Sequence, residues 1–241
     1  MRAETRHQLK QDRFSRTTID VAEATVHWSV EHKNKLIAGV AVAVAVVALL
    51  LGGWYYLNQQ DMKASAELSQ AVRTLGTQVR PANMPAQPDF PSFASAKERA
   101  TAAQTQLQKV IKDYPHSKSA DFARYFLGVA ALDLGDSAAA EKDFKEVAGV
   151  HNDDLASLAN FALAAVYRNS GREKDAIDIY KKLADKPTRT VGKTTAQMEL
   201  AATYQAAQQP AEAKRIYEQI QKENPNTEAA QLASNKAQEI K

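Results

Sequence analysis

The chain contains no cysteine among its 241 residues. This excludes disulfides, zinc sites built from thiolates and thiol catalysis, although it says little about the redox state of the compartment. Proline and glycine are also scarce, with eight and nine residues. Few segments favour strands, whereas alanine, glutamate, lysine, glutamine and leucine are abundant. We therefore expect an all-α protein without a β-sheet.

Neither sign of charge dominates the sequence. The 31 basic and 28 acidic residues give a formal net charge of +3. The two signs are mixed along the chain and form no basic stripe, so we expect no nucleic-acid partner.

One long apolar run interrupts this mixed composition at Leu36–Leu57, with the sequence LIAGVAVAVAVVALLLGGWYYL and no charged residue. At a rise of 1.5 Å per residue, such a helix is about 33 Å long, enough to cross a hydrocarbon core of about 30 Å. Basic residues precede the run. Aromatic residues, whose rings suit the headgroup level of a membrane, stand at its end. The predicted membrane anchor residues at these two ends are Lys33, Lys35, Trp54, Tyr55 and Tyr56. We predict one transmembrane helix.

Two other interpretations of the run are a buried core helix and a cleavable signal peptide, for which Ala64-Ser65-Ala66 resembles a cleavage site. The run is longer than the roughly 7 to 15 apolar residues usual in a signal, and a leader of 35 residues precedes it. Lysine and arginine are more frequent before the span than after it, which favours a cytoplasmic leader in a bacterial inner membrane protein. The predicted domains are a leader at 1–35, a span at 36–57 and an extracytoplasmic domain at 58–241.

The leader divides into two parts. Residues 1–16 are polar and rich in arginine, and we expect no fixed structure there. Thr17 and Asp20 have the spacing of a capping box, which predicts the start of an amphipathic helix of about 15 residues. This helix suits the inner leaflet or a cytoplasmic partner, or it extends the span.

A repeated segment occupies the second half of the chain. LGVAALDLGDSAAAEKDF begins at Leu127, LAAVYRNSGREKDAIDIY at Leu163 and LAATYQAAQQPAEAKRIY at Leu200. A period of this size with helical apolar spacing predicts helix pairs that bury their apolar faces only by stacking on their neighbours. The turns within the pairs are expected near Gly135, Gly171 and Gln208.

The pattern resembles the tetratricopeptide repeat. The positions that carry the resemblance in the first copy are Leu127, Gly128, Ala131, Gly135, Ala140, Phe144, Val147 and Asn152, with equivalents in the other two. The family's early tryptophan is absent, two copies lack the glycine after leucine, and one lacks the closing proline. The resemblance implies a right-handed superhelical solenoid of about four helix pairs plus a capping helix.

The rest of the array follows the same pattern. The segment 58–77 continues as helix, Arg80–Phe93 is a proline-rich loop, and Ser95–Tyr114 supplies the second helix of this first pair. A polar helix at Asn226–Lys241 suits the cap of a solenoid. We therefore expect nine helices after the span.

In the resembling family, the first helix of each pair lines a concave groove. The residues that this implies for the groove are Phe122, Tyr125, Val129, Leu132, Asp133, Leu158, Phe161, Ala165, Arg168, Asn169, Thr195, Met198, Ala202, Gln205 and Ala206. Aromatic and methionine side chains there suit an extended or helical peptide. The alternative is that these aromatics only pack against neighbouring helices. A clamp for a peptide carboxylate is disfavoured, since only Arg168 and Asn169 could form it.

Signals for catalysis are sparse. Gly192-Lys193-Thr194 resembles the end of a P-loop, but Pro187 stands where that motif needs its first glycine. His151 with Asp153 and Asp154 could ligate a metal, yet acidic residues at that place are typical of a helix start. We predict no catalytic residues, no cofactor and no metal site.

The leader, the single span and the array together resemble the ancillary subunit of the bacterial Sec translocon. This resemblance implies a non-enzymatic scaffold whose partners are translocon subunits, periplasmic chaperones or exported chains. An adaptor for envelope assembly or cell division is the alternative, and an envelope hydrolase is a third hypothesis. The sequence determines neither the partner nor the oligomeric state.

Overall fold

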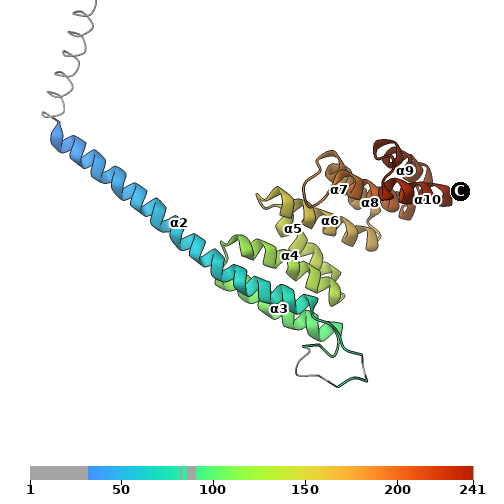
Figure 1. The fold of residues 1–241 in the computed structure, drawn as a ribbon, viewed down its shortest axis with the longest axis horizontal. Helices are drawn as coiled ribbons and strands as arrows, with labels where there is room; N and C mark the ends of the chain where they lie inside the picture. The colour runs from blue at the N-terminus through green and yellow to red at the C-terminus, as the bar shows by residue number, and fades with distance from the viewer. Residues whose placement is uncertain (1–31, 82, 86–90, 241) are drawn as a thin grey trace, which may run out of the picture. The chain divides into compact units, whose positions relative to one another are not determined.

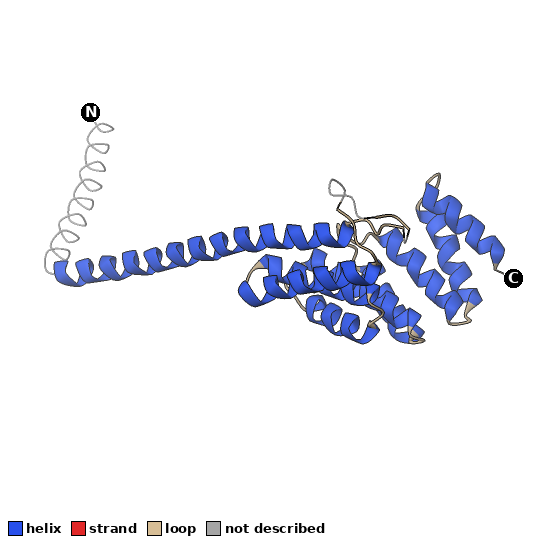
Figure 2. Cartoon of the chain, turned by 90° about the horizontal axis from the view of Figure 1, so that it is seen from below, coloured by secondary structure: helices blue, strands red, loops and turns tan. Residues whose placement is uncertain are grey.

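The computed structural model describes residues 32–81, 83–85 and 91–240. The amphipathic helix predicted from Thr17 lies outside these residues. The chain divides into two compact units, Met1–Asn58 and Gln59–Lys241. In the described part, the named elements are nine helices, α2 to α10, and no strand occurs (Figure 2). The predicted all-α class is confirmed.

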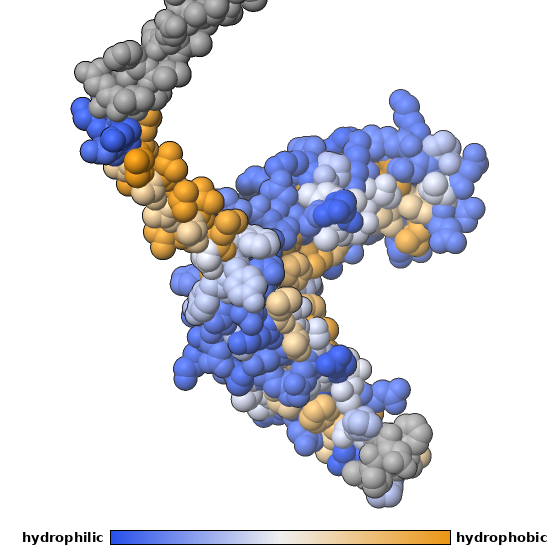
Figure 3. Space-filling model, turned by 60° about the vertical axis from the view of Figure 1, so that its left-hand side comes forward, coloured by the Kyte–Doolittle hydropathy of each residue, from blue (hydrophilic) through white to orange (hydrophobic). Residues whose placement is uncertain are grey.

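The described part of the first unit belongs to helix α2 (Lys33–Gly76). Every residue from Lys33 to Asn58 is exposed, including Leu49 at 76% and Trp54 at 66%. Figure 3 shows this segment as a nearly continuous hydrophobic surface beyond the basic residues at its start. The helix is long and apolar enough to cross a membrane, by length and composition.

The second unit is a linear array of helices joined by short connections. In Figure 1, α3 to α10 follow one another in chain order, and each packs mainly on its neighbours in sequence. Their bounds are α3 Ala96–Asp113, α4 Lys118–Asp133, α5 Ser137–Ala148, α6 Asp153–Asn169, α7 Glu173–Asp185, α8 Lys193–Ala206, α9 Pro210–Glu223 and α10 Glu228–Glu239. The predicted helices and turns are confirmed at these places, to within a few residues.

Local sequence explains where several helices begin. The side chain before the first residue of α3, α4, α5, α6 and α10 accepts a hydrogen bond from the backbone N–H three residues on, which satisfies one unpaired donor. These capping residues are Ser95, Ser117, Asp136, Asn152 and Thr227. Helix α9 begins instead with Pro210, whose fixed φ suits a first helical position.

The three repeated pairs turn through the same backbone conformation. Gly135, Gly171 and Gln208 have φ values of 78°, 73° and 56°. In each turn, the next residue's N–H bonds to a carbonyl five residues back, at 2.8–2.9 Å. Glycine adopts this left-handed region readily, whereas a side chain is strained there. The third copy therefore makes the family turn without the residue that favours it.

Each pair is held together by an aromatic ring from its second helix. Phe144, Tyr180 and Tyr217 are at most 2% exposed. A Cβ atom built on Gly128 would lie 2.7 Å from Cε1 of Phe144, so only glycine fits under this ring. The equivalent positions in the next two copies hold Ala164 and Ala201, both fully buried. Small residues on the first helix thus let the second helix approach closely.

The first pair combines the end of α2 with α3. Ala64 and Ala71 are fully buried in one cluster with Leu107 and Val110. Between the two helices, the predicted loop leaves and returns at an isolated bridge between Val79 and Phe93. The expected first pair with an inserted loop is present.

Substituting Gly128 by alanine should lower the free energy of unfolding, although alanine is the better helix former. The added methyl group must displace the buried Phe144 ring, and overpacking of this kind costs about 1–3 kcal/mol. Urea unfolding of the full chain in detergent micelles, followed by circular dichroism, measures the change. The double variant Gly128→Ala with Phe144→Leu should be less destabilised than the sum of the two single variants. Strict additivity would contradict the contact.

Replacing Gln208 by glycine should stabilise the array by about 1 kcal/mol, because the left-handed backbone conformation costs a side chain about that much. The matched control is Gly171→Gln, which should destabilise by a similar amount. The urea midpoints of the two variants should move in opposite directions. A urea midpoint of Gln208→Gly equal to that of the parent chain would show that the Gln208 turn is unstrained.

Candidate functional site

The residues predicted to line a groove all lie on α4, α6 and α8, the first helices of the three repeated pairs. Helices α6 and α8 also contact each other directly. We call the side of the array formed by these residues the first-helix face. On α4, Phe122 is 37% and Leu132 41% exposed, and both are available to a ligand.

Other aromatic residues of this face are partly committed to the core. Tyr125 is half-buried, with its ring centre 5.6 Å from that of Phe144. Phe161 meets Tyr180 edge to face at 5.5 Å between centres. Burial raises the pKa of the Tyr125 phenol, because a low-dielectric environment disfavours the charged form. Tyr125 and Phe161 therefore present only part of each ring to solvent, between the two predicted roles of groove and core.

The remaining predicted residues differ in what they can offer. Val129 and Met198 pack against the main core cluster, and Leu158 is half-buried. Asn169 is exposed, next to Arg168 in the last turn of α6. Ala165 and Ala202 are half-buried, whereas Thr195 and Ala206 are exposed.

Three polar groups of the predicted groove already have partners. The Arg168 guanidinium bonds to the Glu199 carboxylate at 2.5 Å, across α6 and α8. Asp133 accepts a bond from Arg99 at 2.8 Å, and Gln205 accepts one from the Tyr217 hydroxyl at 3.1 Å. A peptide carboxylate would have to displace Glu199 from Arg168.

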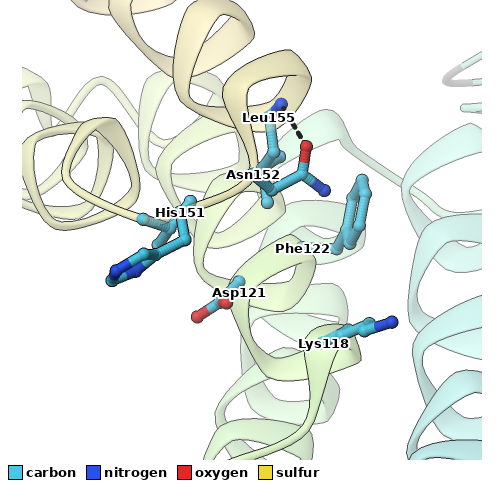
Figure 4. A pocket seen from close by; sticks show the side chains of 7 residues that line it. Lys118, Asp121, Phe122, His151, Asn152 and Leu155 are labelled. Carbon is cyan, nitrogen blue, oxygen red and sulfur yellow. Dashed lines mark hydrogen bonds between the residues drawn. The ribbon is translucent and has the colours of Figure 1, made fainter.

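A surface pocket of about 450 Å³ opens where α4 meets the joint between α5 and α6. Its lining residues are Lys118, Asp121, Phe122, Val150, His151, Asn152 and Leu155. Figure 4 shows Phe122 and Asn152 beside each other, with the Asn152 Oδ1 atom accepting a bond from the Leu155 N–H. The volume is within the usual range of ligand pockets. A lining that combines apolar residues such as Phe122 and Leu155 with polar ones such as Asn152 suits an anchoring side chain of a peptide.

Of the pocket residues, sequence reasoning found only Phe122 as a groove candidate. His151 was considered with Asp153 and Asp154 as a metal ligand. In the structure, Asp154 bonds to Arg189 at 2.6 Å, and Asp153 lies 3.6 Å from Lys186. The Arg189 contact lowers the pKa of Asp154. These carboxylates tie one joint of the array to the next.

Within the described residues, no group of three potential ligands could hold a metal ion. Asp143 has a pKa raised to about 6, mainly because burial disfavours its charged form and also because Glu146 lies near. It lies on α5, apart from the residues of the pocket.

Comparison with known proteins agrees with the repeated architecture. Residues 26–179 match the model of a tetratricopeptide repeat-like domain, and residues 195–227 match that of the tetratricopeptide repeat. No curated protein matches the chain.

Two similar solved structures show nearly identical TPR-like repeats of a "putative kinesin light chain" from Podosopora anserina, one of them a variant. Each is 16% identical, has a TM-score of 0.55, and covers 74% of this chain. The match covers 84% and 85% of the two neighbours. At this identity, the likeness shows the fold alone.

Proposed function

The chain belongs to the tetratricopeptide repeat-like domain family, and on that premise we propose that it is a membrane-anchored scaffold that binds a protein through its first-helix face. Repeats of this family suit protein binding and provide stacked helices rather than catalytic machinery. The observation that carries the proposal is the pocket beside Phe122, where an exposed aromatic ring stands next to a cavity on the face that the family uses.

The anchor is supported by the exposure of the apolar segment in α2. A buried core helix would place some of the residues 36–57 inside the protein, yet all of them are exposed. Burying one such leucine or valine contributes about 1.5–3 kcal/mol, so a run of 22 exposed residues, all but three glycines apolar or aromatic, would be very costly in water. The hydrocarbon core of a bilayer would remove these side chains from water.

Loss of the segment as a signal peptide would damage the array. Cleavage near Ala64-Ser65-Ala66 would fall inside α2, where Ala64 is fully buried against the second helix of the first pair. It would also remove Asp61, which bonds to Ser119 at the start of α4. Retention of the apolar segment keeps both contacts.

The finer role in the proposal is that of an ancillary subunit or chaperone adaptor at the Sec translocon of a bacterial inner membrane. A cytoplasmic leader, one span and an extracytoplasmic array would hold the first-helix face near emerging chains. Tethering raises the effective concentration, so weak contacts at Phe122 can recruit a partner. An adaptor for envelope assembly or cell division has the same architecture and differs only in its resident partner.

Photo-crosslinking in cells distinguishes these partners. A photo-reactive residue in place of Tyr125 or Phe161, each partly exposed, should capture translocon subunits or exported proteins. The same residue in place of Lys174, at the start of α7, is the control and should capture neither. Capture of division or outer-membrane assembly proteins alone would favour the alternative adaptor.

Truncation of the exposed ring tests the face itself. Phe122→Ala should lower the yield of partner captured by a photo-reactive residue at position 125 about fivefold. This loss corresponds to removal of an interface anchor worth about 1 kcal/mol. Leu232→Ala on α10 removes a comparably exposed side chain, which is 49% exposed, and should leave capture unchanged. Equal effects of the two variants would argue against a localised site on α4.

The topology can be measured because the chain has no cysteine. A single cysteine at Lys174 should react with a membrane-impermeant maleimide in intact spheroplasts, whereas one at Arg13 should react only after permeabilisation. The reverse pattern would overturn the orientation, and reaction of both would contradict the span.

A further inference from the structure

The start of α4 is tied to α2 by a carboxylate. Asp61 Oδ1 accepts hydrogen bonds from the backbone N of Ser119 at 3.1 Å and from its Oγ at 3.0 Å. Ser119 is only 6% exposed, so this contact is shielded from competing water. A second carboxylate, Glu67, accepts bonds from Lys109 at 2.6 Å and from the Tyr114 hydroxyl at 3.2 Å. The joint between α3 and α4 therefore lies against the segment that begins near Asp61.

That segment follows the aromatic end of the apolar run closely. Asp61 comes five residues after Tyr56. Five residues advance about 7.5 Å in a helix. Even a fully extended chain of five residues spans only about 18 Å, which limits the distance in any arrangement of the two units. Headgroup regions are about 5–8 Å thick, and the screening length in physiological salt is about 8 Å. A bilayer whose boundary is at Tyr56 thus has its headgroups near this joint.

The joint carries basic side chains on its surface. Lys112, His116 and Lys118 are exposed, and within the described residues none of the three takes part in an ion pair. The nearby carboxylates are occupied, since Asp61 bonds to Ser119 and Asp113 pairs with Lys109 at 3.1 Å. In Figure 4, the Lys118 ammonium points away from Asp121 and His151.

We propose that the α3–α4 joint, through Lys112, His116 and Lys118, binds the anionic headgroups of the bilayer that holds α2. The proposal rests on the membrane anchor of the proposed function. A lysine near an anionic surface is attracted to it, and attraction falls off within a screening length. The contact would hold the array against the membrane surface. Of the three residues, only Lys118 also lines the pocket beside Phe122.

Spin labels on the full chain test this proposal. The protein is reconstituted in nanodiscs of phosphatidylcholine alone or mixed equally with phosphatidylglycerol, both with a trace of nickel-chelating lipid. A label at Pro115→Cys, in the joint, should collide with headgroup nickel at least twice as often in the anionic discs. The variant with Lys112, His116 and Lys118 all changed to glutamine should lose this increase, and so should the parent chain in high salt.

Matched controls separate charge from position. Changing Lys174, Lys214 and Lys222 to glutamine removes three lysines, one more than the joint variant, from exposed sites elsewhere and should leave the increase intact. Equal collision in the two kinds of disc, or an increase that survives the joint variant, overturns the proposal.

A label at Val44→Cys tests the anchor separately. Collision with oxygen rather than with aqueous quenchers would place Val44 in the bilayer, so that a negative result at Pro115 counts against headgroup binding alone. If Val44 instead lies in water, both the anchor and the headgroup contact are wrong.

Discussion

The array depends on one packing pattern: in each repeated pair, the second helix buries a large aromatic ring and the first helix carries a small buried residue. Phe144 leaves no room for a Cβ atom at Gly128. In the other two pairs, Tyr180 and Tyr217 are at most 2% exposed. The first helices of these pairs carry Ala164 and Ala201 at the position equivalent to Gly128. A ring provides a large apolar area, and the small residue allows the two helices to approach closely enough to cover it.

This fit determines what the first-helix face has left for a partner. Rings of the face such as Tyr125 and Phe161 touch the core rings edge to face or tilted, so each contributes to stability with one side. Phe122 lies one turn before Tyr125, where no neighbouring helix fully covers it, and it borders the pocket. Exposed and buried side chains thus alternate along α4: Phe122 and Leu132 face solvent, whereas Ala120 and Ala123 are fully buried. The predicted groove residues therefore differ in how much of each side chain is exposed, and a role in binding stays a prediction.

Features that recur in each copy of the repeat could be predicted from the sequence. The positions of the helices and of the turns at Gly135, Gly171 and Gln208 followed from the threefold pattern, because local spacing and turn chemistry determine them. The amphipathic helix expected near Thr17 lies outside the described residues. Contacts between side chains from different repeats were not foreseen. Arg168 with Glu199 and the lining of the pocket by Leu155 depend on the angle at which one pair stacks on the next, which no single segment encodes.

Asp61 shows how a residue without a motif can matter more than one within a motif. Its carboxylate satisfies a backbone N–H in the first turn of α4, where the helix dipole also favours negative charge. The same bond brings the start of the first-helix face to a place five residues from the aromatic end of the apolar run. In sequence, Asp61 is one acidic residue after the apolar run and matches no pattern. Because 58 positions separate it from Ser119, only the folded array reveals that it connects the part of α2 that follows the apolar run to the helix that carries Phe122.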